Sequence, residues 1–227
     1  MFLAMTGAVD IGQRRANEAL MRQAIVESGT VDWQRCRSMN ERVCAWLNVE
    51  GTAISQPVAH PEREEGSFYL DHDVFGRPSA AGAVYLDALC SPSDPLLVVY
   101  GHRMGNSTEM FSELGEYHEQ ERFDALGTAS WSTPEGTDTF EPVCALVVDE
   151  QWNGLDAGAA ASRRPNAKDG LPPLNAWLTA LLGRANASSG KSDALCASAQ
   201  RALVLVTCSS PIAGGPERTV TVFASTG

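Results

Sequence analysis

The sequence lacks several features that would have pointed to common classes of protein. No apolar run approaches the roughly 20 residues that a membrane-spanning helix needs. There is no C-x-x-C pair and the four histidines lack metal-ligand spacing, so we expect neither a metal site nor a cofactor. Lys and Arg do not cluster, and the formal net charge is −11, which argues against nucleic acid as a partner.

The cysteines are too few and too scattered for a small domain framed by disulfides. There are six of them: Cys36, Cys44, Cys90, Cys144, Cys196 and Cys208. If Cys208 is a free nucleophile, at least one of the other five is also unpaired, unless two chains are cross-linked.

The sequence predicts three helices. Residues 10–27 mix apolar and charged side chains without Gly or Pro after Gly12, and Ser28-Gly29 follows as a stop. Asp32 is a candidate cap for a second short helix that ends near Asn40. A compact amphipathic helix is predicted at 174–182, inside a long polar stretch between strands, and such insertions are more often functional or mobile than inert.

Short apolar runs separated by turn residues dominate the rest of the chain. We predict strands at residues 43–49, 82–87, 96–100, 137–149, 202–207 and 219–224, and an edge strand or bend around Pro57. Strands at this density predict a mainly β fold, as a closed or nearly closed barrel. The simplest organisation is a single globular unit in which residues 1–40 are a helical appendage to a barrel domain of residues 41–227.

Cys208 stands at the end of the apolar run Leu203–Thr207 and before an irregular loop. A cysteine in this position is by default a small buried hydrophobe. Two features favour a nucleophile instead, namely the loop that the thiol faces and Arg218, which opens the next strand and can return close to the thiol. A neighbouring cation favours a thiolate and can stabilise an oxyanion.

His102 follows another buried run, Leu96–Tyr100, after Gly101, which permits tight backbone geometry. A histidine here is as often a hydrogen-bonded structural residue as a base. A cysteine and a histidine together are the minimum for thiol acyl chemistry, with the imidazole protonating the leaving group.

These residues resemble the motifs of a known family. Val206-Thr207-Cys208, followed ten residues later by Arg218, resembles the signature of the sortases, cysteine transpeptidases of Gram-positive surfaces. Tyr100–Met104, followed by Met110, Phe111 and Leu114, is similar to the histidine motif of the class B sortases. The similarity continues through residues 40–47, 51–58, 68–73 and 82–87, and in all spans about residues 40–224.

The resemblance implies an eight-stranded sortase β-barrel with N-terminal helices and a helix in the loop between the sixth and seventh strands, which residues 154–200 fit. It implies Cys208 as nucleophile, His102 as general acid and base, and Arg218 as the residue that binds substrate and oxyanion. Candidate substrate contacts beside the thiol are Thr207, Ser209 and Ser210. Some class B sortases carry an acidic residue two places after the cysteine, and here that residue is Ser210, so a mechanism of Cys, His and Arg is preferred to one assisted by Asp.

The implied activity is cleavage of the C-terminal sorting signal of surface proteins through a thioester, with transfer to an amine of a lipid-linked cell-wall precursor. A pilin lysine as acceptor, or water as in a thiol peptidase, stays open, and a barrel that only binds peptide is the least favoured alternative. The resemblance implies a monomer that works at the extracellular face of the membrane. The family's N-terminal anchor is not seen in this chain, whose N-terminus is compatible with a native start or with a cut just after an anchor.

Overall fold

A computed structural model describes residues 22–24, 30–105, 107–155, 173–210 and 215–227. Its nine strands form one sheet in the order β5-β1-β2-β3-β4-β8-β9-β6-β7, and β5 also pairs with β6, so eight strands close a ring and β7 lies outside it. The strands are β1 (Val43–Val49), β2 (Ser55–Ala59), β3 (Tyr85–Leu86), β4 (Leu96–Tyr100), β5 (Ala129–Thr133), β6 (Gly136–Asp149), β7 (Ala187–Ser188), β8 (Arg201–Cys208) and β9 (Glu217–Ser225). The predicted eight-stranded barrel is therefore confirmed.

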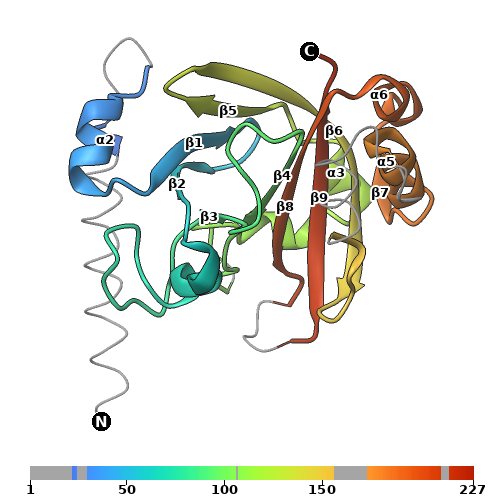
Figure 1. Ribbon diagram of the computed structural model, residues 1–227. Helices are drawn as coiled ribbons and strands as arrows, with labels where there is room; N and C mark the ends of the chain where they lie inside the picture. Colours follow the sequence, from blue (N-terminus) through green and yellow to red (C-terminus); the bar gives the residue numbers. More distant parts are fainter. Residues whose placement is uncertain (1–21, 25–29, 106, 156–172, 211–214) are drawn as a thin grey trace.

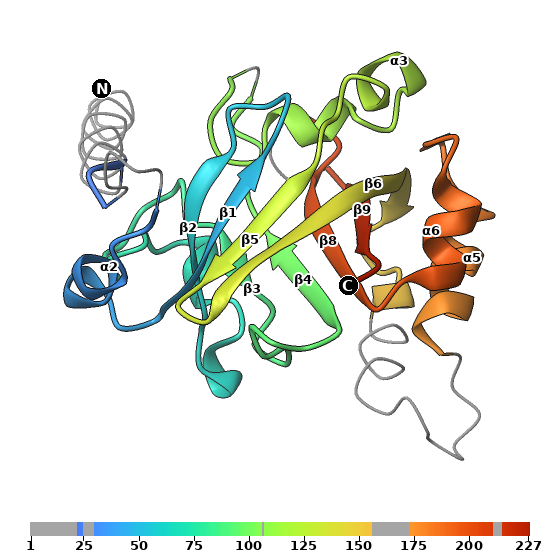
Figure 2. The same ribbon diagram turned by 90° about the horizontal axis from the view of Figure 1, so that it is seen from above.

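Short helices surround the barrel. They are α2 (Trp33–Met39), α3 (Gln120–Phe123), α5 (Leu174–Leu182) and α6 (Ser192–Ser198), with 3-10 helices η1 (Arg63–Glu65), η2 (Phe68–Leu70) and η3 (Glu113–Glu116). In Figures 1 and 2, α2 lies on one side of the barrel, whereas α5 and α6 lie together on the opposite side, next to β6. The helices α5 and α6 come from the connection between β6 and β8, where the sequence predicted one helix.

The two strands that lead to the predicted site are covered on both faces. In β4 the four residues Leu96–Val99 are all buried, and in β8 the six residues Ala202–Thr207 are all buried. A continuous apolar run of this kind is what a strand buried on both faces requires, since alternation is expected only when one face meets water. The residues at the ends of these strands are thus held by a packed and rigid core.

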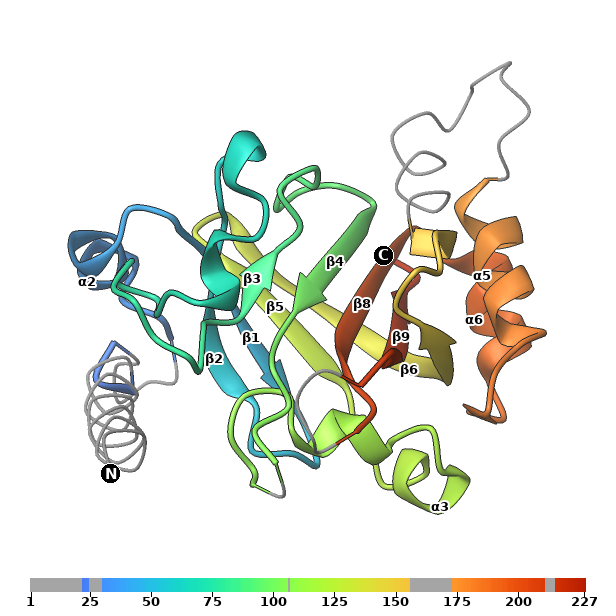
Figure 3. The same cartoon turned by 90° about the horizontal axis from the view of Figure 1, so that it is seen from below.

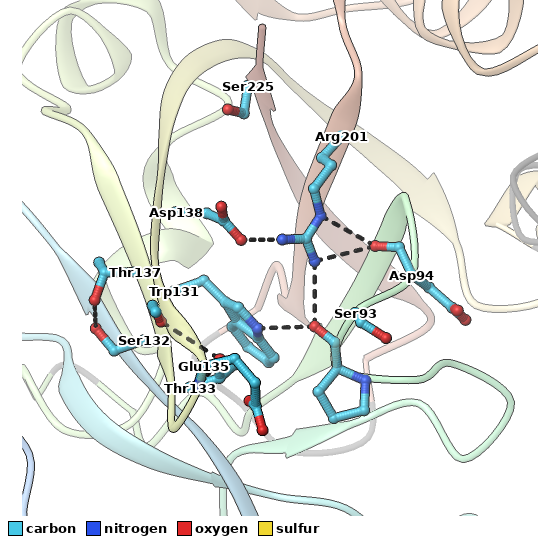
Figure 4. Close-up of polar contacts among 12 residues, drawn as sticks. Ser93, Asp94, Trp131, Ser132, Thr133, Glu135, Thr137, Asp138, Arg201 and Ser225 are labelled. Atoms are coloured by element: carbon cyan, nitrogen blue, oxygen red, sulfur yellow. Dashed lines mark hydrogen bonds and ion pairs between the residues drawn. The ribbon is translucent and has the colours of Figure 1, made fainter. Parts of the chain in front are cut away.

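The end of β8 that lies away from Cys208 is fixed by Arg201. Its guanidinium binds the Asp138 carboxylate of β6, and also the carbonyl oxygens of Pro92 at 3.1 Å and Asp94 at 3.1 and 3.3 Å (Figure 4). These carbonyls belong to the loop just before β4. Arg201 therefore aligns the starts of β4 and β8, and this alignment sets which residues meet at the other end of the two strands.

Most predicted elements are present with small differences. The predicted bounds of β1, β4 and α5 agree with the structure, and Asp32 caps α2 by accepting a hydrogen bond from the Arg35 amide. The predicted strand 82–87 is shorter, because only Tyr85–Leu86 pairs with a neighbour. The predicted helix at 10–27 lies almost wholly outside the described residues. The sequence missed β5 and α6, and it read as a loop the segment that contains β7.

Candidate active site

Cys208 is the last residue of β8, and Arg218 lies directly opposite it on the antiparallel strand β9. Directly opposed residues of an antiparallel pair lie on the same face, with Cβ atoms about 5 Å apart. The thiol is half-buried, in contrast to the fully buried residues before it in the strand. The hairpin thus brings the guanidinium back beside the thiol, as the sequence predicted.

His102 reaches the same edge through the parallel pairing of β4 with β8. Tyr100 is paired with Val206, and the Gly101 amide donates a hydrogen bond to the Val206 carbonyl at 3.1 Å. His102 and Cys208 each stand two residues beyond this pair, at the carboxyl ends of neighbouring strands. Figure 3 shows β4, β8 and β9 side by side, in the order that brings the three residues to one end of the barrel.

The hydrogen bond of the His102 imidazole shows which of its two ring nitrogens carries the hydrogen. His102 Nε2 lies 2.7 Å from the carbonyl oxygen of Leu70. Because a carbonyl oxygen can only accept, Nε2 carries the hydrogen, and Nδ1 is left as the nitrogen that can exchange a proton. Among the described residues, the hydrogen-bond partner of the imidazole is thus the backbone carbonyl of Leu70.

Gly101 is required where it stands, because a side chain is packed against its backbone. A Cβ at this position would lie 2.7 Å from ring atoms of Phe111, which is fully buried. The Phe111 amide also donates to the carbonyl of His102 at 3.0 Å. The chain on either side of the imidazole is therefore fixed against Phe111.

Arg218 is held on the wall of the site by three groups. Its Nη2 lies 3.0 Å from the Glu150 carboxylate, and its Nη1 donates to the carbonyls of Gly215 at 2.6 Å and Glu217 at 3.1 Å. The ion pair is partly solvated, with 28% of the Arg218 side chain and 48% of the Glu150 side chain exposed. These contacts orient the guanidinium but leave it within reach of solvent and of a ligand in the cleft.

A cleft of about 440 Å³ contains all three residues. Its other walls combine apolar side chains with two carboxylates and with residues next to the thiol. They are Leu70, Tyr100, Gly101, Arg103, Val148, Asp149, Glu150, Trp152, Leu155, Val206, Thr207, Ser210 and Val220. A cleft with apolar walls and a few convergent polar groups is typical of a ligand-binding site.

One wall of the cleft is attached to α5. The indole Nε1 of Trp177 donates to the Gly154 carbonyl at 2.9 Å, and the Arg184 guanidinium lies 5.9 Å from the ring centre of Trp152. The helix that the sequence predicted inside the late connection therefore supports the segment of Trp152–Leu155, which lines the cleft.

The three residues proposed as substrate contacts lie in different surroundings. Ser210 lines the cleft. Thr207 also lines the cleft, but the residue is only 3% exposed. Because successive side chains of a strand point to opposite faces, its side chain lies on the face opposite Cys208. Its buried hydroxyl has no hydrogen-bond partner among the described residues. Ser209 is not part of the lining, since its amide donates to the Glu217 carbonyl at 3.1 Å and its Oγ lies 3.0 Å from Thr219 Oγ1.

Four of the other cysteines, Cys36, Cys90, Cys144 and Cys196, are buried, whereas Cys44 is half-buried like Cys208. None of the six cysteines forms a disulfide, and burial raises the pKa of the thiols of Cys36, Cys44, Cys144 and Cys196, to about 12 for Cys44 and Cys144. Within the part of the chain that the structure describes, no group of three or more His, Cys, Asp or Glu residues is arranged to hold a metal ion, and no helix has the length and apolar character to cross a membrane.

Sequence reasoning missed Glu150, Trp152 and Leu70 as parts of this site. Glu150 reaches Arg218 only because β6 pairs with β9 in a particular register, which places Val148 opposite Arg218. Leu70 lies in η2 and contributes its backbone carbonyl, for which the side chain gives no signal. An acidic residue directly after a predicted strand was the one available clue, but the sequence does not show that this strand pairs with the strand of Arg218.

Comparisons with known proteins support the fold. No protein-family model matches the chain, and no curated protein matches it. Among solved structures, Clostridium perfringens sortase B is 22% identical, with a TM-score of 0.67 over 84% of this chain and 97% of that one. A Staphylococcus aureus sortase B–substrate complex is 18% identical with a TM-score of 0.73, over 95% of this chain and 97% of that one. Bacillus anthracis sortase B in complex with AAEK1 is 14% identical, with the same score and coverage. The chain thus has the fold of the class B sortases.

Proposed function

We propose that this protein is a cysteine transpeptidase of the sortase type, in which Cys208, His102 and Arg218 carry the reaction. The observation that carries the proposal is the strand register, which leads all three residues to one edge of the sheet and into one cleft. A half-buried thiol beside a cation and an imidazole is a suitable arrangement for a cysteine nucleophile. The fold shared with the sortase B structures supports the same assignment.

In the proposed reaction the Cys208 thiolate attacks the scissile carbonyl of a bound peptide. The Arg218 guanidinium donates hydrogen bonds to the oxygen as it becomes an oxyanion. The imidazolium of His102 gives its proton to the leaving amine as the C–N bond breaks, and a thioester to Cys208 remains. An incoming amine then attacks the thioester and gives a proton to His102, so that the new C–N bond forms, the C–S bond breaks and the Cys208 thiolate is released beside the imidazolium.

Arg218 is the main candidate for the oxyanion donor because the nearest backbone donor is in use. The amide of Ser209, the residue after the nucleophile, donates to Glu217 within the pairing of β8 with β9. The guanidinium of Arg218, by contrast, is bound by groups at the margin of the cleft and has donors in excess of any single partner.

The proposed substrate is the C-terminal sorting signal of a surface protein, bound as an extended peptide along the apolar walls. Ser210 would contact it through its side chain, and Thr207 through its backbone, because the Thr207 hydroxyl is buried on the other face. We assign the catalytic domain to residues 41–227 and an appendage to residues 1–40. The proposed place of action is the extracellular face of the membrane, and the proposed acceptor is an amine of a lipid-linked cell-wall precursor.

A peptide-library transfer assay read by mass spectrometry tests this function. Peptides with varied sorting motifs are incubated with the enzyme, with and without an oligoglycine or lysine amine. We expect a product in which the N-terminal part of the peptide is joined to the added amine, and no product from Cys208→Ala. Cys44→Ala, which removes the other half-buried cysteine, is the control and should retain activity.

The products separate the proposal from its alternatives. Joining to a pilin-like lysine peptide in preference to oligoglycine would indicate a pilin-polymerising enzyme. Hydrolysed peptide at the same rate with and without amine would indicate a thiol peptidase. Binding of peptide with no cleavage at all would contradict the proposed function and would leave a peptide-binding barrel.

A further inference from the structure

We infer that Arg103 is a positioning residue, whose guanidinium clamps the chain that follows the nucleophile to the loop that follows the general acid. The inference rests on the proposed function. Arg103 comes directly after His102, and its Nη1 donates to the carbonyl of Ser209, the residue directly after Cys208. One side chain thus spans the neighbours of both reacting groups.

The guanidinium of the clamp is buried, and it is paired with a partly exposed carboxylate. The Arg103 side chain is 5% exposed, and its Nη2 lies 3.1 Å from the Glu116 carboxylate at the end of η3. A guanidinium offers fixed donors in one plane, so that binding the carboxylate sets the direction in which the other nitrogen points. Glu116 therefore aims Arg103 Nη1 at the Ser209 carbonyl.

Gly115 provides the space that this geometry needs. A Cβ at Gly115 would lie 2.3 Å from Arg103 Nη1, 2.7 Å from its Cζ and 2.8 Å from its Cδ, and these are its nearest neighbours. Atoms at such distances overlap, so any side chain at Gly115 would displace the guanidinium. The carbonyl of Gly115 also lies 3.1 Å from Thr219 Oγ1, which connects η3 to β9.

Ser209 is held from the opposite side by β9, through its amide and its hydroxyl, as described above. Arg103 adds the third contact, on the carbonyl, so the residue after the nucleophile is fixed at three points. Loss of the carbonyl contact lets the chain beyond Cys208 shift relative to His102 and Arg218. A displacement of about 1 Å at reacting groups costs on the order of a hundredfold in rate.

The test compares Arg103→Ala, Arg103→Lys and Gly115→Ala with Arg122→Ala, in the transfer assay with the best library peptide. Arg122 is the matched control, because it also binds Glu116, at 3.4 Å, but is 63% exposed and, within the described part of the chain, makes no hydrogen bond to Ser209. We expect Arg103→Ala to lower kcat by about 30- to 100-fold with KM within about threefold, and Arg103→Lys and Gly115→Ala to lower it by about tenfold. Arg122→Ala should stay within twofold of the parent.

Two further readouts separate positioning from general stabilisation. Methylguanidinium should restore part of the kcat of Arg103→Ala but not of Gly115→Ala, where Arg103 is still present and displaced. In the Arg103→Ala background, Gly115→Ala should cause no additional loss, because the two changes remove the same contact. Gly115→Ala keeps every polar side chain, so its kcat still tests the positioning role of Arg103 if Arg103→Ala does not fold.

A kcat within twofold of the parent in both Arg103→Lys and Gly115→Ala would overturn the inference. A loss confined to KM would also overturn it, because it would make Arg103 a substrate contact. If the parent transfers no peptide, amide hydrogen exchange at Ser209 still tests the clamp. Exchange should be at least tenfold faster in Arg103→Ala than in the parent and unchanged in Arg122→Ala, and equal rates in all three proteins would refute the clamp.

Discussion

Replacement of Arg218 by alanine is expected to lower kcat by a hundredfold or more and to leave the protein folded. Arg218 lies directly opposite Cys208, and removal of a single oxyanion donor typically costs on the order of a hundred- to a thousandfold, which is about 3–4 kcal/mol of transition-state stabilisation. KM should change by less than about threefold, because the oxyanion exists only after attack has begun.

The cost of the same change to stability is expected to be small. The ion pair that Arg218 forms with Glu150 is partly exposed on both sides, and pairs of this kind contribute about 1 kcal/mol or less. Urea titrations of parent and variant should therefore differ by about 1 kcal/mol, which separates a catalytic effect from partial unfolding.

Glu150→Gln is the matched control for Arg218→Ala. It removes the charge that holds the guanidinium but leaves the donors of Arg218 and the carbonyl contacts from Gly215 and Glu217. We expect its kcat to stay within about threefold of the parent. A loss of less than about tenfold in Arg218→Ala, or an equal loss in Glu150→Gln, would refute the assignment of Arg218 as oxyanion donor.

Three other changes probe the surroundings of the site. Gly101→Ala should lower kcat/KM by more than tenfold in the transfer assay, because its Cβ would lie 2.7 Å from the Phe111 ring and push His102 out of position; an unchanged value would contradict this. Trp177→Phe removes the hydrogen bond to Gly154 and should raise KM several-fold with kcat nearly constant, in contrast to Arg218→Ala. Burial raises the pKa of the Cys144 thiol from 9.0 to about 12, so this thiol ionises at a lower pH in the unfolded protein than in the folded one. The Cys144 thiol alone should lower the free energy of unfolding by about 1.4 kcal/mol per pH unit between about pH 9 and pH 12, so the slope in Cys144→Ala should be shallower than in the parent by about that amount, and equal slopes in urea titrations would disprove the effect.

The sequence was most informative where a signal was local. Continuous apolar runs identified β1 and β4 because both strands are buried, and Gly183 marked the end of α5. The strand β5, Ala129–Thr133, was missed because its five residues contain only two buried side chains among small polar ones. The helix α6, Ser192–Ser198, was missed because its serines and alanines give it no clear apolar stripe.

In the candidate site, too, the residues marked by a local motif were predicted and those that depend on long-range contacts were missed. Cys208, His102 and Arg218 each stand at the end or start of a recognisable strand, and their motifs predicted that they meet. Arg103 and Glu150 act through contacts with residues 106 and 68 positions away in the sequence. Contacts at such separation depend on the register of the barrel and on the path of its loops, which a single sequence does not specify.

The most direct test of the central claim is the mass of the intact protein after a brief reaction with the peptide selected by the library assay, without added amine, followed by acid quenching. The account predicts an increase equal to the N-terminal part of the peptide, mapped by proteolysis to Cys208 and reversed by hydroxylamine, and accumulation of less adduct in His102→Ala. The absence of any adduct, or an adduct of the same mass that persists in Cys208→Ala, would contradict it.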